Sequence, residues 1–328
     1  MNRRTFLGAA GSCTAHLLLT LGVGTAAARR LFAAMPRGPI GGREPWGRLE
    51  KLAEGAWALV STPLAGGDQA MRTFSNGGIV QGREGVLVIE GLASEEGARW
   101  LAGAARELTG RWPTHVVLTH VHGDHSAGLA GYRADGAEPL FVSTAATRAD
   151  LAERSRKQGR ASAAAETLHG DRVRLVEESP ATIDLGGRRV RVDPRSGHTR
   201  SDLVVVLEEP RLVWCGDLVW NGLFPNYVDA TPSELSRHVR ALLDDRAERW
   251  VPGHGSVADR AALETYVALL DDVESAGRRA VESGTPAAAA AREYRPPGGL
   301  GEWVRFSPDY YEVALVAWER ELTKGARP

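Results

Sequence analysis

Cysteine is scarce in this sequence of 328 residues, which contains only Cys13 and Cys215. So few cysteines exclude a disulfide framework. An excess of charge of one sign is lacking as well, because 40 Lys and Arg residues face 41 Asp and Glu residues. Binding to nucleic acid requires a basic groove, and nothing in this composition builds one. We therefore expect no nucleic-acid partner.

A long apolar run is also missing, since the most apolar stretch near the amino terminus, residues 17–24, is too short for a membrane span. Arg3 and Arg4 are the only charged residues among the first 28 and precede this stretch, which is typical of a twin-arginine export signal. Ala26 and Ala28 fit a cleavage site. We predict that residues 1–28 are a signal peptide and that the mature protein lies in the periplasm or outside the cell.

Cleavage after residue 28 would remove two arginines and no acid, and would change the formal net charge from −1 to −3. It would also remove Cys13, which leaves Cys215 without a partner. The cleaved protein would have no stable membrane insertion. The alternative is a protein anchored in the membrane by an uncleaved amino terminus.

The rest of the chain alternates between strands and helices, with two runs of strands, which indicates an α/β (α+β) protein with two sheets between outer helices. We expect a leader or linker at 29–48, a metal-binding domain at 49–256, and C-terminal helices at 257–328 packed on the same domain. Strands are expected at 56–61, 78–82, 85–89, 115–119, 172–176, 188–193, 203–207 and 211–215. Helices are expected at 93–109, 144–159, 232–244, 258–283, 287–291 and 309–323.

The most informative motif is His-Val-His-Gly-Asp-His at 120–125, directly after the apolar strand expected at 115–119. His120 and His122 are two residues apart, so in extended geometry both project to one side and can bind one ion. Asp124 and His125, displaced by the turn at Gly123, can point at a second ion. Imidazole and carboxylate are ligands that Zn²⁺ prefers in catalytic sites, where one position stays open for water.

This motif resembles the HxHxDH signature of the metallo-β-lactamase superfamily, and the other ligands of that family follow in order. His198 lies in a Ser-Gly-His-Thr loop, Asp217 follows a strand, and His254 lies in a Pro-Gly-His-Gly loop. The resemblance implies an αββα sandwich with two Zn²⁺ ions, although Fe or Mn would also suit these ligands. It implies that Asp217 bridges a first ion, held by His120, His122 and His198, and a second ion, held by Asp124, His125 and His254.

The resemblance also implies a mechanism, in which a hydroxide on the metals attacks the substrate and Asp124 orients it and transfers a proton. The segment 218–229 should form a wall of the site, with Trp220, Asn221 and Tyr227 as candidates for substrate contact. One residue departs from the family pattern. Glu90 stands where the family has an Asp that supports the metal ligands by hydrogen bonds. The extra methylene of Glu90 would rearrange those hydrogen bonds or lose them.

Comparison within the superfamily narrows the range of possible substrate classes. The glutathione loop of glyoxalase II enzymes is absent, Trp220 replaces the Tyr of acyl-homoserine lactonases, and Asp217 stands where zinc β-lactamases have Cys or Ser. The chain looks most like exported hydrolases associated with quinoprotein and sulfur-oxidation systems. We expect an exported dinuclear zinc hydrolase that cleaves an ester, thioester, lactone or amide of a small-molecule substrate.

Three alternatives stay open at this point. The first is a mononuclear iron oxidoreductase similar to persulfide dioxygenases, and the second is a non-catalytic metal-binding accessory protein of a periplasmic redox system. The third is a metallo-β-lactamase. The sequence does not fix the oligomeric state.

Overall fold

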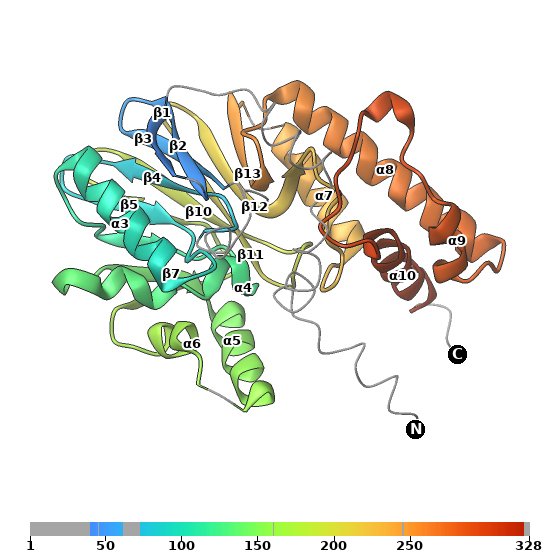
Figure 1. Ribbon diagram of the computed structural model, residues 1–328, viewed down its shortest axis with the longest axis horizontal. Coiled ribbons are helices and arrows are strands. Elements are labelled where there is room, and N and C mark those ends of the chain that lie inside the picture. The colour runs from blue at the N-terminus through green and yellow to red at the C-terminus, as the bar shows by residue number, and fades with distance from the viewer. Residues whose placement is uncertain (1–39, 45, 62–72, 160, 245, 325–328) are drawn as a thin grey trace.

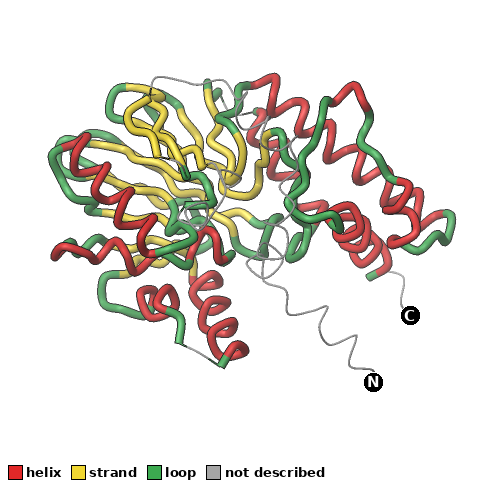
Figure 2. Tube along the Cα trace, viewed as in Figure 1, coloured by secondary structure: helices red, strands yellow, loops and turns green. Residues whose placement is uncertain are grey.

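The computed structural model describes residues 40–44, 46–61, 73–159, 161–244 and 246–324 (Figure 1). The predicted signal peptide, residues 1–28, lies outside these ranges. The described chain forms two β-sheets, with helices on the outer face of each (Figure 2).

The first sheet contains eight strands in chain order, β1 to β8. Its first five strands pair antiparallel, and the pairs β5·β6, β6·β7 and β7·β8 are parallel. Parallel neighbours end at the same edge, so the residues that follow β5 and β6 lie close together. The strands are β1 (Ile40–Glu44), β2 (Gly47–Ala53), β3 (Ala56–Ser61), β4 (Gly77–Gln81), β5 (Val86–Ile89), β6 (His115–Val117), β7 (Leu140–Thr144) and β8 (Val173–Val176).

The second sheet has the order β13-β12-β11-β10-β9. Its members pair antiparallel except for β12 and β13, which are parallel and place Trp220 opposite His254. The strands are β9 (Ala181–Asp184), β10 (Arg189–Arg195), β11 (Asp202–Leu207), β12 (Leu212–Asn221) and β13 (Arg249–Gly255).

Helices cover both outer faces, α3, α5 and α6 on the side of the first sheet and α7 to α10 on the side of the second (Figure 1). Helix α3 begins where Ser94 Oγ accepts a hydrogen bond from Gly97 N and ends at Gly110 in left-handed conformation. The helices are α3 (Glu95–Thr109), α4 (Gly123–Ser126), α5 (Ala145–Gln158), α6 (Ala163–Leu168), α7 (Pro232–Leu243), α8 (Arg260–Glu282), α9 (Ala287–Glu293) and α10 (Tyr310–Thr323), with 3₁₀ turns η3 (Leu129–Gly136) and η4 (Gly298–Leu300).

Three hydrophobic clusters fill the spaces between these layers. One joins the first sheet to its helices and includes Val88 and Leu101. A second lies between the sheets and includes Val117 and Val205. The third joins the second sheet to the C-terminal helices. The buried strand side chains pack on the layer that they face, and the predicted αββα sandwich with C-terminal helices is confirmed.

Several boundaries differ from the sequence-based expectation, and β7 and β9 lie where no strand was expected. The main differences are at the leader and at the wall of the site. The expected leader at 29–48 already contains β1 and the start of β2, and Trp46 is 7% exposed. The glycine and proline residues around this segment predicted a linker, although the segment contains an edge strand, which pairs on one side only. Strand β12 continues to Asn221, so the wall expected at 218–229 begins as strand. The register of β12 shifts on either side of Gly216, and this irregularity carries the chain past Asp217 without ending the pairing.

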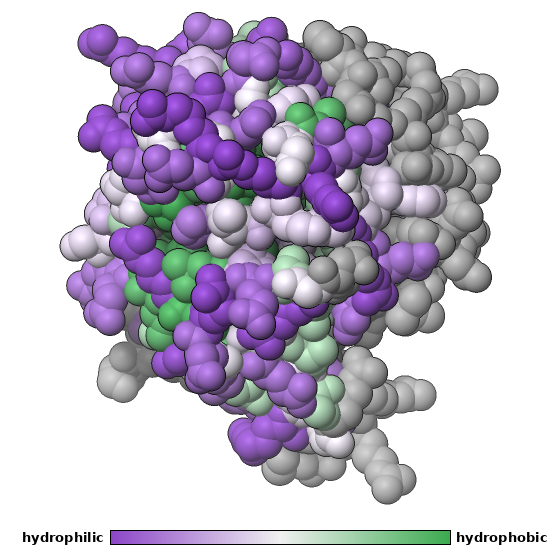
Figure 3. All heavy atoms as spheres, turned by 90° about the vertical axis from the view of Figure 1, so that its left-hand side faces the viewer, coloured by the Kyte–Doolittle hydropathy of each residue, from purple (hydrophilic) through white to green (hydrophobic). Residues whose placement is uncertain are grey.

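In the part of the chain that the structure describes, no helix is both long and apolar enough to cross a membrane. On the face in Figure 3, hydrophilic residues surround a limited band of hydrophobic ones. Val316, at 41%, is the large hydrophobic residue that stands exposed among the described residues.

Candidate metal centre

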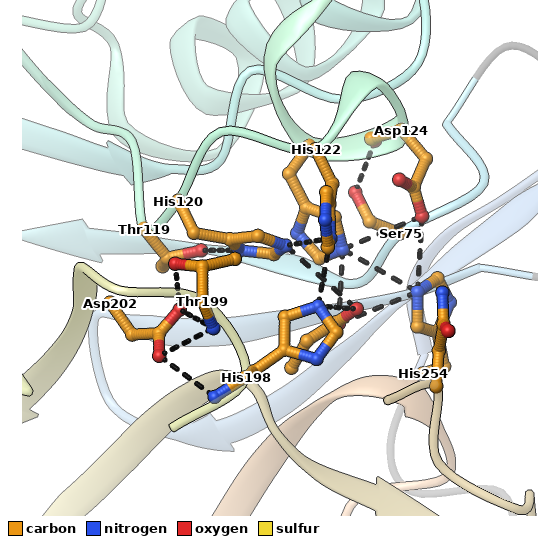
Figure 4. Close-up of polar contacts among 12 residues, drawn as sticks. Ser75, Thr119, His120, His122, Asp124, His198, Thr199, Asp202 and His254 are labelled. Carbon is orange, nitrogen blue, oxygen red and sulfur yellow. Dashed lines mark hydrogen bonds and ion pairs between the residues drawn. The ribbon is translucent and has the colours of Figure 1, made fainter. Parts of the chain in front are cut away.

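The seven candidate ligands converge from both sheets on one buried place. His120 and His122 follow β6, Asp124 and His125 lie in α4, and His198 follows β10, while Asp217 and His254 lie within β12 and β13. All seven are buried. Figure 4 shows the imidazoles of His120, His122, His198 and His254 pointing toward one another.

The first group consists of His120, His122, His198 and Asp217, whose ligand atoms all lie within 4.8 Å of one another. His122 Nδ1 lies 3.2 Å from His120 Nε2 and 2.8 Å from His198 Nε2. Burial lowers the pKa of His198 to about 3 and lowers the pKa of His120 as well. These imidazoles are therefore neutral at physiological pH. His120 Nε2 and His198 Nε2 thus both lie close to His122 Nδ1, which is itself a hydrogen-bond acceptor. A cation bound by these nitrogens would stabilise the arrangement.

The second group consists of Asp124, His125 and His254. Asp124 Oδ2 lies 3.1 Å from His254 Nε2 and 3.5 Å from His125 Nε2. Burial opposes charge on His125, but the carboxylates of Asp217, Glu90 and Asp124 outweigh it and raise its pKa well above the ordinary value. Asp124 Oδ1 has no hydrogen-bond partner among the described residues. The carboxylate of Asp124 in this group and the buried carboxylates of Asp217 and Glu90 beside it together supply negative charge that can hold a cation.

Asp217 lies between the two groups, with one carboxylate oxygen toward each. Its Oδ2 is 3.2 Å from His198 Nε2 and 3.8 Å from His120 Nε2. Its Oδ1 is 3.0 Å from His125 Nε2 and 3.4 Å from His254 Nε2. This is the geometry that a carboxylate needs in order to bridge two ions.

Glu90 supports ligands of both groups. Its Oε1 accepts hydrogen bonds from Thr119 Oγ1 at 2.5 Å and from His125 Nδ1 at 3.0 Å. Thr119 Oγ1 in turn accepts from His120 Nδ1 at 3.0 Å. The backbone of Glu90 has a φ of 82°, in the left-handed region that a residue with a side chain rarely adopts. The hydrogen bonds that support the ligands are therefore present with Glu at this position.

Sequence reasoning missed two further carboxylates. Asp229 Oδ2 accepts from His122 Nε2 at 2.8 Å and from Arg154 at 2.7 Å, and the hydrogen bond from His122 lowers the pKa of Asp229 well below its usual range. Asp229 is 107 residues from His122, and no local pattern connects them.

Asp202 is the second carboxylate, and it fixes the loop that carries His198. It accepts from the backbone N–H of His198 at 3.1 Å and from Thr199 Oγ1 at 2.7 Å (Figure 4). Burial raises the pKa of Asp202 to about 7, against the effect of these hydrogen bonds. The Asp that closes a short polar turn after His198 is a signal that could have identified it.

The three candidates for substrate contact have different surroundings. The ring of Trp220 lies 4.3 Å from that of His254, centroid to centroid. Asn221 donates to Ser256 O at 3.0 Å and Oγ at 3.1 Å. Tyr227 is buried in the core of the C-terminal helices. Their contact with substrate stays a prediction, with Trp220 nearest to the candidate ligands.

A cavity of about 260 Å³ lies beside the first group. Its wall joins the ligand loops to α5, and most of the side chains in it are charged. The lining residues are Val121, Asp150, Glu153, Arg154, Lys157, Thr199, Arg200 and Asp229.

Comparison with known proteins identifies the family. The sequence profile of the metallo-β-lactamase superfamily matches residues 70–254, the range that contains all seven candidate ligands. The chain belongs to this superfamily. Its fold and its buried histidine and aspartate groups together indicate a metal-binding protein.

Two metallo-β-lactamases are similar in sequence to this superfamily member. It is 27% identical over 202 residues to the metallo-β-lactamase type 2 of Bacillus cereus, a match over 60% of this chain and 73% of that protein. It is 25% identical to the metallo-β-lactamase type 2 of Bacillus sp. (strain 170) over 60% of this chain and 72% of that protein.

Solved structures show the same fold at lower identity. A metallo-β-lactamase from Pontibacter korlensis superposes with a TM-score of 0.55 and 21% identity, over 69% of this chain and 99% of its own. An inverting sec-alkylsulfatase from Pseudomonas sp. superposes with a TM-score of 0.64 and 15% identity, over 84% of this chain and 50% of its own. The sulfatase thus matches a larger share of this superfamily member than the β-lactamase does.

Proposed function

We propose that this protein is a dinuclear zinc hydrolase that cleaves an ester, thioester, lactone or amide. The observation that carries the proposal is the position of Asp217, whose two oxygens each face a separate group of ligands. A carboxylate shared in this way has little purpose in a site for a single ion. Superfamily membership and the buried histidine and aspartate groups support the proposal.

The donor set fits zinc. It consists of imidazole nitrogens and carboxylate oxygens, and burial lowers the pKa of His120 and His198 and so favours their neutral form. His120, His122 and His198 would hold one ion, Asp124, His125 and His254 the other, with Asp217 common to both. When bound, such ions lower the pKa of water and polarise an acyl oxygen.

Asp124 is suited to accept and return a proton. Burial opposes its ionisation, but His125 and His254 outweigh burial and lower its pKa, so Asp124 is a carboxylate at neutral pH. One of its oxygens is occupied by His254, and the other is without a hydrogen-bond partner in the described part of the chain. Ser75 Oγ donates to the backbone oxygen of Asp124 at 2.8 Å and steadies its position. A held carboxylate with one free oxygen can accept a hydrogen bond from a water molecule or a substrate, as a general base must.

The test is Asp124→Asn, with Asp171→Asn at an exposed position as control. Wild type and both variants, loaded with zinc or with iron, are assayed on an ester, a thioester, a lactone and an amide. A β-lactam and a secondary alkyl sulfate are added, because similar proteins carry those activities in their names. We expect acyl cleavage by the zinc form and a rate at least about 10²-fold lower in Asp124→Asn, the usual contribution of positioned proton transfer.

The same samples separate the alternatives. Oxygen uptake with a thiol persulfide, confined to the iron form and without acyl cleavage by the zinc form, would replace the hydrolase with a dioxygenase-like oxidoreductase. β-Lactam cleavage alone would make the protein a β-lactamase. Absence of turnover on every substrate would favour a metal-binding accessory protein.

We also propose export to the periplasm, supported by Arg3, Arg4 and the apolar stretch after them. Replacing both arginines by lysine keeps the charge but removes the twin-arginine pair, and should block export. Periplasmic yield equal to that of the wild type would refute the proposal. A mature amino terminus near residue 29 would distinguish cleavage from an uncleaved anchor.

A further inference from the structure

His254 differs from the other candidate ligands in how its ring is held. His125 Nδ1 donates to Glu90, His122 Nε2 donates to Asp229, and His120 Nδ1 donates to Thr119. His254 Nδ1 is buried and has no hydrogen-bond partner among the described residues. His198 Nδ1 also has none, but the backbone of His198 is bound by Asp202. The contacts that hold His254 on the side of the ring away from Asp124 and Asp217 are therefore not hydrogen bonds to Nδ1.

Three aromatic rings surround that imidazole. The centroid of Phe306 lies 5.4 Å from that of His254 with the rings at 87°, and Phe74 lies at 5.8 Å and 73°. Trp220 lies at 4.3 Å with the rings at 48°. Phe306 also contacts the other two rings, at 5.4 Å from Phe74 and 5.5 Å from Trp220. Edge-to-face contacts of this kind restrict ring rotation, since the edge of one ring favours the face of the next.

Phe306 comes from a part of the chain beyond the matched superfamily range, which ends at residue 254. The segment that carries it is attached to the end of β12. Phe224 N donates to Val304 O at 2.8 Å, and Val304 N donates to Gly222 O at 3.2 Å. On the other side of Phe306, Tyr310 begins α10 and lies 6.3 Å from Trp220. Phe306 is thus fixed on both sides and is 8% exposed.

We propose that Phe306 is a positioning residue for His254, so that affinity for the second ion depends on the C-terminal segment. The inference rests on the proposed two-ion site and adds a residue that the superfamily range does not contain. Without the ring of Phe306, the imidazole of His254 keeps Phe74, Trp220 and His125 as ring neighbours but loses the nearly perpendicular contact from the C-terminal segment. It then samples orientations in which Nε2 no longer faces Asp124 and Asp217. Loss of a supporting contact behind a metal ligand typically weakens metal binding by about 10–100-fold.

Phe306→Leu and Phe306→Ala test this proposal, with Tyr311→Leu as matched control. Tyr311 is 9% exposed and lies in the same C-terminal segment, and its ring contacts Phe224 and Tyr294. If Phe306 acted only by keeping the segment folded, loss of Tyr311 would have the same effect. Competition with a chromogenic zinc chelator gives the two affinities, and thermal unfolding of the metal-free proteins reports folding.

We expect the first ion to bind all variants as it binds the wild type. The second should bind Phe306→Leu about 10-fold more weakly and Phe306→Ala more weakly still, whereas Tyr311→Leu should retain it. Unchanged second-ion affinity in both Phe306 variants, or an equal loss in Tyr311→Leu, would overturn the inference alone. A wild-type protein that binds one ion in all would overturn the two-ion proposal and this inference with it.

Discussion

Gly253 allows Asp217 to occupy its position between the two ligand groups, and a methyl group at residue 253 should displace it. A Cβ built at Gly253 would overlap Asp217 Oδ1, and it would lie 2.9 Å from the carbonyl carbon of Gly216 and 3.0 Å from Asp217 Cγ. Real Cβ atoms essentially never approach other heavy atoms closer than 3.0 Å. Backbone on one side and a buried carboxylate on the other leave the methyl group no free space.

The size of the effect follows from the displacement. To reach ordinary contact, the carboxylate oxygen must move by on the order of 1 Å, and a shift of that size in a catalytic group costs about 10²-fold in activity. Overpacking a well-packed interior costs about 1–3 kcal/mol of unfolding free energy. We therefore expect Gly253→Ala to be less stable without metal by that amount, and to lose the paired binding of two ions.

Gly103→Ala is the control, because a Cβ at Gly103 in helix α3 meets nothing within 4 Å. Alanine in a helix is favoured over glycine by about 1 kcal/mol, so this variant should be at least as stable as the wild type. Urea unfolding of the metal-free proteins and elemental analysis of the zinc-loaded ones measure the two effects. Gly253→Ala that keeps two ions at wild-type affinity and wild-type stability would refute the reasoning.

Two further predictions concern the ligand groups. Asp229→Asn should weaken binding of the first ion by about 10-fold, because His122 loses its charged acceptor. Arg154→Gln should change the affinity for that ion by less than about fivefold, since the Arg154–Asp229 pair is partly exposed. A larger loss in Arg154→Gln than in Asp229→Asn, measured by chelator competition, would contradict this prediction. Acidification from pH 7 should release the second ion first, because ligands bind as neutral imidazole. Burial opposes charge on His125 and His254, yet Asp217 raises the pKa of both, whereas burial lowers the pKa of His198 to about 3. Ion counts on protein equilibrated at decreasing pH would show simultaneous loss if this were wrong.

The candidate ligands could be found from the sequence because each lies in a short pattern tied to the end of a strand. His120 to His125 follow β6, and the turn of α4 separates Asp124 and His125 from His120 and His122. Local geometry thus predicts a division of the motif, and the structure places His120 and His122 in one group and Asp124 and His125 in another, while a third group of Glu90, His120 and His125 overlaps both. The αββα sandwich followed from the alternation of strands and helices, and its three cores are where that alternation requires them.

The residues that support the ligands could not be found in this way, because their partners are distant in the sequence. Asp229 reaches His122 across 107 residues, and Phe306 reaches His254 across the whole of α8 and α9. Glu90 was recognisable by its place after β5, but its hydrogen bonds to Thr119 and His125 and its backbone φ of 82° could not be derived from the sequence. Tertiary packing sets such a conformation, and neither composition nor periodicity predicts it.

The supports of the two groups differ in kind, and this gives the two proposed ions unequal roles. Burial lowers the pKa of His120 and His198 in the first group, and hydrogen bonds to Thr119 and Asp229 hold His120 and His122. In the second group, burial opposes charge on His125 but neighbouring carboxylates raise its pKa, and aromatic contacts hold His254. An ion entering the second group must therefore compete with a proton on His125, whereas burial disfavours a proton on His120 and His198. The first group should therefore fill first at limiting zinc, and the second ion should be the one that pH and the C-terminal segment control.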